Sequence, residues 1–468
     1  MATEALEIEK IIKNVLMELK VQNTVETVSS EDGIFDDMNE AIAAAKKAQK
    51  ELKVMPLEFR EKIIKRIREK IMENAELLAK MGVEETGMGR VGDKILKHQL
   101  VAEKTPGTEC LSTIAWSGDR GLTLVEQGPF GVIGAITPST NPSETVFCNS
   151  IGMIAAGNTV VFNPHPGAIK VSNFAVKLIN EAAKEVGAFP NMAVSVRKPT
   201  LETADILFKH KDVELLVATG GPGVVTAVLS SGKRAMGAGA GNPPVIVDET
   251  ADIQKAAADI VNGATFDNNL PCIAEKEVVV VEEVADELIS YMIENGCMLI
   301  HTEQVAKLLD IVFVEKNGKK ILNRQWVGKD AWKILRAIGI DADESIRCII
   351  FEGDKNHPLI KEELMMPILG IVRVDDIDTA IETAVELEGG NRHSAHMHSK
   401  NIDRLTKFAK AVDTAIFVKN APSYAAIGFG GEGYTTFTIA SRTGEGLTCA
   451  ASFTKNRRCV MADSLSIR

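Results

Sequence analysis

Three kinds of sequence feature are missing from this 468-residue chain, and each absence excludes a class of protein. No block of Lys and Arg stands out, and the formal net charge is −11, so the chain is not expected to bind nucleic acid. No uninterrupted apolar run is long enough to span a bilayer, and residues 1–20 lack the solid apolar stretch of a secretory signal. The seven cysteines are scattered and include no Cys-x-x-Cys pair, which disfavours a disulfide framework or a structural zinc site. We therefore expect a soluble protein of the reducing cytoplasm.

The chain is too long for one compact core, so two or three domains are expected. From about residue 130, apolar strand-like segments alternate with helical stretches such as 168–187 and 202–210. This alternation predicts a parallel sheet with helices on both faces, which binds ligands beyond the carboxyl ends of its strands. A second cycle begins near Ala251, so the sequence predicts an α/β fold with two such units. The expected strands of the first unit are 132–136, 159–162, 192–196, 214–218 and 244–248.

The N-terminal segment has a pattern of its own. Apolar residues from Leu6 to Leu19 recur at steps of three and four, which predicts an amphipathic helix over residues 1–20. Residues 21–33 are polar and without periodicity, so we expect a linker over residues 21–35. A helix ahead of a linker can dock on its own domain or a sister subunit, or it can act as a detachable peptide that binds an apolar groove of a partner.

Cys272 is the best-placed nucleophile among the cysteines. It follows Pro271 in NNLPCIAEKEVVVV and precedes the strand-like run EVVVV, so its thiol is expected on a loop between two elements. Cys148 lies in a helical run, and Cys348 adjoins the apolar run CIIF. Free cysteines are usually buried packing residues, and that role is expected for the others.

Two polar turns follow strands of the first unit. In PFGVIGAITPSTNP (129–142), Asn141 can donate an amide N–H to a developing oxyanion, or it can cap the helix that begins near Pro142. In ATGGPGVV (218–225), glycines that open a helix allow close approach of a pyrophosphate. The second turn is not the G-x-G-x-x-G fingerprint and is weak support on its own.

The histidines His393, His396 and His398 alternate in the run HSAHMHS. Alternation would place all three on one face of a strand, as in a metal site. No cysteine or carboxylate lies within the run, so structural or surface roles are the favoured interpretation and no metal is expected.

Together, and in this order along the chain, these segments resemble the aldehyde dehydrogenase superfamily, from about residue 36 to 468. The resemblance is closest to the CoA-acylating branch, the acetaldehyde and propionaldehyde dehydrogenases of bacterial microcompartments. Residues 1–20 also resemble the encapsulation peptides of that branch. The stretches that carry the resemblance are TPSTNP, FNPHPGA, ATGGPGVV, GAGAGNPPVIVDETAD, NNLPCIAEK, SYAAIGFGGEG and TGEGLT.

The resemblance implies a role for each matching residue. Cys272 falls on the nucleophile, and Asn141 falls on the oxyanion-hole amide that works with the backbone N–H of Cys272. Glu363, in EELMMP, falls on the carboxylate that holds the nicotinamide ribose. The residues implied in cofactor binding are Thr137, Pro138, Ser139, Asn163, Pro164, His165, Thr219, Gly220, Gly221, Pro222 and Glu363.

The sequence departs from the hydrolytic members at three places. Their general-base Glu, in an ELGGK motif, is replaced by Ala238 in AGAGN, so water attack on a thioester would lack its base. Asn163, Pro164 and His165 stand where they have Lys-Pro-Ser, and Val225 replaces the second Gly of the turn. A CoA thiol needs less activation than water because its thiolate is the better nucleophile near neutral pH.

The resemblance also implies an architecture. A Rossmann-like cofactor domain is expected at residues 36–119 and 130–248, and an α/β catalytic domain at 249–430. A small β region at 120–129 and 431–468 is expected to join subunits into a dimer or tetramer.

The implied activity is the oxidation of a short aliphatic aldehyde, acetaldehyde or propionaldehyde, with NAD and coenzyme A. Cys272 would form a thiohemiacetal and then a thioacyl enzyme, and CoA would release acyl-CoA. The expected partners are the aldehyde, CoA and microcompartment shell proteins that bind residues 1–20, and the expected location is inside such a compartment in the cytoplasm. The alternatives are a hydrolytic aldehyde dehydrogenase, which Ala238 disfavours, and an inactive scaffold, which the Cys272, Asn141 and Glu363 set disfavours.

Overall fold

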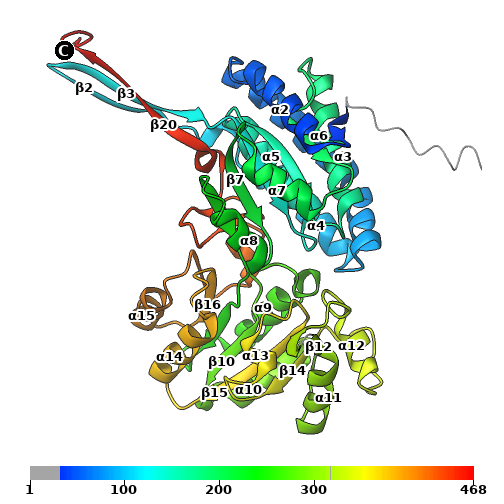
Figure 1. Cartoon of the computed structure of the whole chain (residues 1–468). Coiled ribbons are helices and arrows are strands. Elements are labelled where there is room, and N and C mark those ends of the chain that lie inside the picture. The colour runs from blue at the N-terminus through cyan, green and yellow to red at the C-terminus, as the bar shows by residue number, and fades with distance from the viewer. Residues whose placement is uncertain (1–31, 317, 468) are drawn as a thin grey trace, which may run out of the picture.

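The structure is a computed structural model that describes residues 32–316 and 318–467. Two α/β units lie one above the other, and a long, narrow sheet projects from the upper unit (Figure 1). The helix expected over residues 1–20 and most of the expected linker lie outside the described residues. No helix of the described part is long and apolar enough to cross a membrane.

The upper unit is built on a six-stranded parallel sheet with the order β1-β6-β5-β4-β7-β8. From β4 the chain adds β5 and β6 on one side and then returns to place β7 on the other side. The strand order therefore reverses between β4 and β7, and such a switch point is where α/β sheets bind ligands. The strands are β1 (Ile34–Phe35), β4 (Val132–Thr137), β5 (Thr159–Pro164), β6 (Ala193–Val196), β7 (Val213–Thr219) and β8 (Ala235–Ala238).

Helices cover both faces of this sheet, as the alternating sequence predicts. One layer contains α2 (Met38–Leu52), α7 (Leu201–Lys209) and α8 (Pro222–Leu229). The other contains α3 (Leu57–Thr86), α4 (Val91–Lys104), α5 (Pro142–Ala155) and α6 (Ile169–Glu185). Every residue of α5 is buried, because this helix lies between the sheet and the outer helices of its layer.

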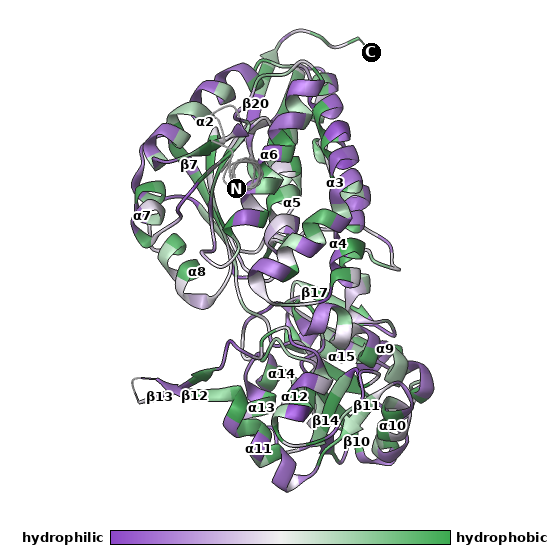
Figure 2. Cartoon of the chain, turned by 90° about the vertical axis from the view of Figure 1, so that its right-hand side faces the viewer, coloured by the Kyte–Doolittle hydropathy of each residue, from purple (hydrophilic) through white to green (hydrophobic). Residues whose placement is uncertain are grey.

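The lower unit has a seven-stranded parallel sheet with the order β11-β14-β15-β10-β9-β16-β17. Its strands are β9 (Pro244–Val247), β10 (Glu277–Val281), β11 (Cys297–Leu299), β14 (Cys348–Glu352), β15 (Ile368–Val374), β16 (Ser394–His398) and β17 (Ile416–Lys419). Its helices are α9 (Ile253–Thr265), α10 (Glu282–Glu294), α11 (Thr302–Val312), α12 (Ala331–Ala337), α13 (Pro358–Lys361), α14 (Ile377–Glu388) and α15 (Ile402–Val412). Figure 2 shows apolar residues gathered on the strands. The same view shows a hairpin that extends from the body of the lower unit and consists of β12 (Phe313–Lys316) and β13 (Lys319–Leu322).

The projecting sheet is antiparallel, with β3 (Gly121–Pro129) between β2 (Ile114–Gly118) and β20 (Thr454–Ala462). A smaller pair, β18 (Ile439–Ala440) and β19 (Gly446–Leu447), lies near β8. Short 3-10 helices complete the described chain: η2 (Thr108–Cys110), η3 (Phe266–Asn269), η4 (Ser423–Ile427) and η5 (Ala450–Phe453).

Three boundaries differ from the sequence-based expectation. Residues 114–118, grouped with the cofactor domain, form β2 of the projecting sheet because they pair with β3. Ile34 and Phe35, placed at the end of the linker, form β1, the edge strand of the upper sheet, because Ile34 is buried where β1 pairs with β6. Residues 244–247, grouped with the first unit, form β9 in the middle of the lower sheet. An isolated apolar run does not say which of two sheets it joins, because both provide the same buried environment.

Candidate active site

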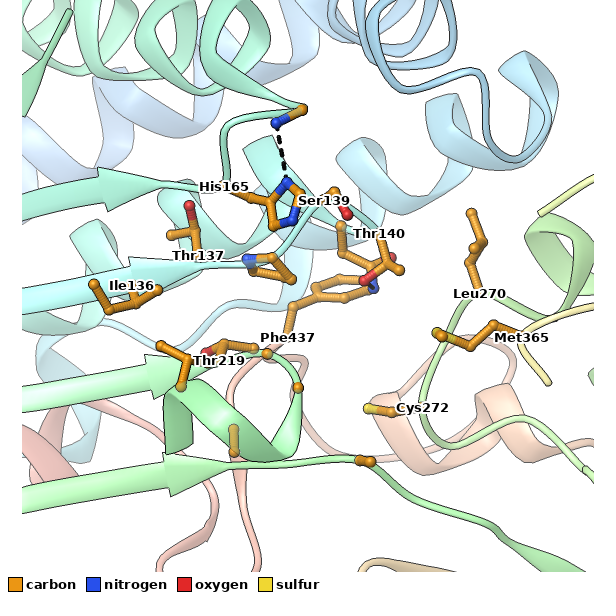
Figure 3. A pocket seen from close by; sticks show the side chains of 18 of the residues that line it. Ile136, Thr137, Ser139, Thr140, His165, Thr219, Leu270, Cys272, Met365 and Phe437 are labelled. Carbon is orange, nitrogen blue, oxygen red and sulfur yellow. Dashed lines mark hydrogen bonds between the residues drawn. The ribbon is translucent and has the colours of Figure 1, made fainter. Parts of the chain in front are cut away.

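A cleft of about 930 Å³ lies between the two units, at the carboxyl ends of β4, β5, β7 and β8. Figure 3 shows Thr137 and His165 on the side of these strand ends, and Cys272 and Leu270 on the opposite side. All thirteen site residues expected from the sequence line this cleft: Thr137, Pro138, Ser139, Asn141, Asn163, Pro164, His165, Thr219, Gly220, Gly221, Pro222, Cys272 and Glu363. The structure therefore brings together segments that are far apart in sequence.

The strand-end wall consists mainly of backbone and small side chains. The N-cap of α8 is Gly221, whose lack of a side chain leaves the first amides of the helix without a side-chain cap. Thr137 is buried at the end of β4, and its hydroxyl has no hydrogen-bond partner among the described residues. Uncapped helix amides and an unpaired hydroxyl are suited to bind an anionic ligand with ribose groups.

The opposite wall is a loop held in an unusual backbone conformation. Asp267, Asn268 and Asn269 have φ angles of 49°, 54° and 67°, a run of three non-glycine residues in the left-handed region. Asn and Asp adopt this region more readily than other residues, and the strain persists where surrounding contacts fix it. Here Asn269 Nδ2 donates to the carbonyls of Ala264 at 2.8 Å and Glu275 at 2.9 Å. The loop that carries Cys272 is therefore fixed at its start.

The Cys272 thiol is partly exposed to the cleft. Burial raises its pKa to about 12; the Glu363 carboxylate also raises it, and the Lys276 ammonium opposes both. Lys276 is buried and donates to Asn269 Oδ1 at 2.6 Å, so it lies beneath the loop. The pKa of the Cys272 thiol thus depends on the charges around it.

Asn141 is the N-cap residue of α5, but its side chain makes no capping hydrogen bond. Its Oδ1 instead accepts a 2.6 Å hydrogen bond from Lys97 Nζ, and its Nδ2 makes only a 3.3 Å contact with Thr140 Oγ1. The helix-cap interpretation is therefore disfavoured. The amide is oriented with Nδ2 as its available donor, at a residue that lines the cleft with Cys272.

His393 is a cleft residue that the sequence did not single out as functional. Its Nδ1 lies 2.6 Å from Ser394 Oγ, and its Nε2 has no partner among the described residues. A Cβ at Gly241 would lie 2.8 Å from His393 Cγ and 2.9 Å from the Cys272 carbonyl oxygen. Only glycine therefore fits at this position, against both His393 and the Cys272 backbone. Burial, with the nearby Lys276, lowers the His393 pKa to about 4, which keeps the imidazole neutral. In the sequence, the alternating histidines of the run HSAHMHS were the signal that could have indicated a role for His393.

The structure gives the cleft few groups that could activate water. Ala238 lies at the end of β8 with its side chain buried in the lining. Of the described lining residues only Glu85 and Glu363 carry carboxylates. Glu85 accepts the Lys170 and Val171 amides at 2.8 and 2.9 Å, so it is engaged at the start of α6. Within the described residues, no group of three or more His, Cys, Asp and Glu side chains could hold a metal ion.

The aldehyde dehydrogenase family model matches residues 20–450, so this chain belongs to the aldehyde dehydrogenase family. The chain is 47% identical to the acetylating acetaldehyde dehydrogenase EutE of Salmonella typhimurium, over 98% of this chain and 99% of that protein. Among solved structures, it is 70% identical to the propionaldehyde dehydrogenase of the Clostridium phytofermentans fucose utilisation bacterial microcompartment. That match has a TM-score of 0.92 and covers 93% of this chain and 100% of the other.

A second solved structure is the Rhodopseudomonas palustris propionaldehyde dehydrogenase with bound propionyl-CoA. It is 53% identical, with a TM-score of 0.92, and the match covers 95% of this chain and 98% of the other. Within the family, the particular branch that these relatives represent is the CoA-acylating one, as the sequence motifs predict.

Proposed function

We propose that this chain oxidises acetaldehyde or propionaldehyde with NAD and transfers the acyl group from Cys272 to coenzyme A. The observation that carries this proposal is that Cys272 and Asn141 line one cleft in which Ala238 stands where hydrolytic relatives have the base that water needs. The relatives named above act on these two aldehydes and, in one structure, hold propionyl-CoA.

The residues of the strand-end wall fit NAD. The Thr137 hydroxyl, buried without a protein partner, is available to a ligand hydroxyl or phosphate. Thr219, Gly220 and the α8 N-terminus would hold the pyrophosphate, and Glu363 would hold the nicotinamide ribose. Bound there, NAD supplies the hydride acceptor of the reaction.

In the first half-reaction, the Cys272 thiol loses its proton to water in the open cleft, and its Sγ adds to the aldehyde carbon, which gives a thiohemiacetal. The oxyanion accepts hydrogen bonds from Asn141 Nδ2 and the backbone N–H of Cys272. Loss of hydride from the same carbon then converts the thiohemiacetal into a thioester on Cys272. The wall that carries Cys272 must hold the carbonyl oxygen in one place during both steps. The hydrogen bonds that fix its loop would keep the Cys272 backbone N–H in position for this.

In the second half-reaction, the CoA thiol attacks the Cys272 thioester. His393, with a neutral imidazole and an Nε2 that has no partner among the described residues, is the group that we propose accepts the thiol proton. Collapse of the tetrahedral adduct releases acyl-CoA and restores the Cys272 thiolate. CoA enters the same cleft after NADH leaves, so ping-pong kinetics are expected.

Aldehyde, NAD and purified protein, assayed with and without CoA, test the proposal. Without CoA we expect one fast turnover per active site, followed by a stall; with CoA we expect steady NADH formation and acyl-CoA as product. Steady turnover without CoA, with free acid released, would show the hydrolytic activity instead. Failure to form NADH under either condition would favour the inactive scaffold.

We also propose that the projecting sheet joins copies of the chain. Its outer strands β2 and β20 form the two edges of that sheet, and they expose apolar side chains: Ile114 is 51% exposed, Trp116 52% and Val460 62%. Exposed apolar edge strands of this kind pair with another chain. Light scattering of the wild type and of Trp116→Glu tests this. A monomeric wild type would contradict the proposal.

Finally, we propose that residues 1–20 direct the enzyme into a microcompartment. The support is their amphipathic sequence pattern and the compartment named for the Clostridium phytofermentans relative. Residues 1–20 fused to a fluorescent protein should form foci when co-expressed with shell proteins. A fusion with Ile11 and Leu16 changed to Lys is the matched control, and diffuse signal from the unaltered fusion would rule out targeting.

A further inference from the structure

A cluster of four buried charges lies directly behind Asn141. Lys94 and Lys97 come from α4, Glu144 from α5 and Asp267 from η3, and each of these residues is at most 2% exposed. The two ammonium groups balance the two carboxylates. Buried charges are stable only when they are paired and hydrogen-bonded, so each member depends on the others.

Lys97 lies at the centre of this cluster. Its Nζ is 2.5 Å from Asp267 Oδ2, 2.6 Å from Asn141 Oδ1 and 3.0 Å from Glu144 Oε1. A lysine ammonium can only donate, and here it donates hydrogen bonds to Asp267 and Asn141 and forms an ion pair with Glu144. Its side chain also lies behind the cleft wall, with Nζ 5.7 Å from the centre of the Phe437 ring.

The contact with Lys97 determines which way the Asn141 amide faces. An amide can turn over and exchange its oxygen and nitrogen, but an ammonium can pair only with the oxygen. Nδ2 must therefore point away from Lys97, and its remaining contact is the 3.3 Å approach to Thr140 Oγ1. A positive charge on the carbonyl side also polarises the amide, which makes its N–H a stronger donor.

The same ammonium reaches the loop that carries Cys272. Asp267 is the first residue of the left-handed run described above, and its Oδ1 accepts the Arg90 backbone N–H at 2.8 Å. Lys97 therefore joins α4 and the Asn141 turn of the upper unit to the cysteine loop of the lower unit. The two donors of the oxyanion hole come from these two units.

We propose that Lys97 is a positioning residue of the oxyanion hole, which orients the Asn141 amide and fixes its separation from the Cys272 backbone N–H. This inference rests on the proposed function, because it assigns Lys97 a part in that reaction. Lys97 touches neither substrate nor cofactor in this role. Although burial alone would lower its pKa, Asp267 and Glu144 raise it, so the side chain stays charged.

Lys94 offers a matched control. It is equally buried, it is on the same helix, and its Nζ donates to the same Asp267 Oδ2 at 2.9 Å. Its other contact is the Thr140 carbonyl at 3.3 Å, and no hydrogen bond joins it to the Asn141 side chain. Loss of either lysine leaves a buried carboxylate underpaired, but only loss of Lys97 releases the amide.

The test is a double-mutant cycle of Lys97→Met with Asn141→Ala. Lys97→Met should lower kcat by about 10²-fold, approaching the loss of an oxyanion donor, with the Kd of NAD within about twofold of wild type. In the Asn141→Ala background the same change should cost less than about threefold. Lys94→Met should lower the Tm to a similar extent but leave kcat within about threefold of wild type.

A second readout separates this inference from the proposed function. Acylation of Cys272 by p-nitrophenyl acetate passes through a tetrahedral oxyanion, releases p-nitrophenolate and requires neither NAD nor CoA. The same cycle measured on this step gives an answer even if no aldehyde is oxidised. If Lys97→Met does not fold, Lys97→Met/Glu144→Gln removes one charge of each sign and takes its place.

Two results would overturn the proposal. One is that the Lys97 and Asn141 losses multiply in the double variant, because independent effects would mean that Lys97 does not act through the amide. The other is an equal loss of acylation rate in Lys94→Met, because that would show only the cost of disturbing the buried cluster.

Discussion

The two walls of the cleft differ in how completely their polar groups are bonded. On the strand-end wall, the Thr137 hydroxyl and the first amides of α8 have no side-chain partner among the described residues. On the opposite wall, the side chains of Asp267 and Asn269 are bonded on several sides, and the backbone is held in a left-handed run. The Thr137 hydroxyl and the α8 amides are therefore left for ligands, whereas Asp267 and Asn269 use their hydrogen bonds to fix the loop that carries Cys272.

The proposed reaction explains this difference. NAD and CoA must use the strand-end wall in turn, so contacts through backbone and small groups suit both. The cysteine wall must hold one carbonyl oxygen through two successive tetrahedral adducts, and that requires a fixed geometry. Changes on the cysteine wall or at Asn141 are therefore expected to lower kcat, and changes at the other groups of the strand-end wall to raise KM.

The largest effect is expected from Cys272→Ala. This change should abolish aldehyde-dependent NADH formation and leave the affinity for NAD within about twofold of wild type, because only the covalent step is lost. NADH production and NAD titration check the two parts. Cys459→Ala, at an exposed position of β20, is the control and should retain full activity. Residual turnover in Cys272→Ala would remove this thiol from the mechanism.

Asn141→Ala comes next, with an expected fall in kcat of about 10²–10³-fold, the usual loss for one oxyanion donor. The side chain makes no capping bond to α5, so the variant should show no loss of a helix cap. Steady-state kinetics and thermal unfolding measure both. A kcat within about threefold of wild type, with a stability loss of about 1 kcal/mol, would restore the helix-cap interpretation.

An intermediate effect is expected on the reactivity of the thiol. Burial and the Glu363 carboxylate raise the Cys272 pKa to about 12, so the thiolate fraction should grow about tenfold for each pH unit between pH 7 and pH 10. Glu363→Gln removes the negative charge and should lower this pKa, which should speed alkylation at pH 8 about three- to tenfold. Iodoacetamide inactivation rates measure this, with Glu362→Gln as control. Slower alkylation in Glu363→Gln would contradict the assigned sign.

An effect of similar size, but on cofactor binding, is expected from Thr137→Val on the strand-end wall. Its hydroxyl has no partner in the described residues, so its removal should leave the Tm nearly unchanged and raise KM for NAD about three- to tenfold, the effect of one hydrogen bond. Thr159→Val is the opposite case, because that hydroxyl donates to the Ala45 carbonyl at 3.0 Å. It should lower the Tm and leave KM unchanged. A lower Tm for Thr137→Val would show that the Thr137 hydroxyl is bonded within the protein, and the two walls would then not differ in how their polar groups are bonded.

The sequence predicted the elements around the cleft well because their signals are local. The strands 132–136, 159–162 and 214–218 lie within β4, β5 and β7, and the turns after β4 and β7 lie where Asn141 and Thr219 were expected. Apolar runs and turn residues carry this information without reference to the rest of the chain.

The supports of the site were not predictable in this way. Lys97 had no sequence signal of a functional role, yet its side chain is fully buried against Asn141 and Asp267. His393 read as structural or surface, yet it lines the cleft. The burial of Lys97 and the position of His393 both depend on contacts between segments far apart in sequence. The local pattern of residues does not predict such contacts.

The pairing of β3 with β20 constrains when this protein can finish folding. Nine residue pairs, from Thr454↔Pro129 to Ala462↔Gly121, join segments that are 325 to 341 residues apart in sequence. At about 5–20 residues per second on the ribosome, residues 121–129 wait roughly 15–70 seconds before residues 454–462 exist. During that interval β3 can pair only with β2, as a hairpin with an open edge. If copies associate through this sheet, assembly follows completed synthesis, so truncated chains are excluded from the oligomer.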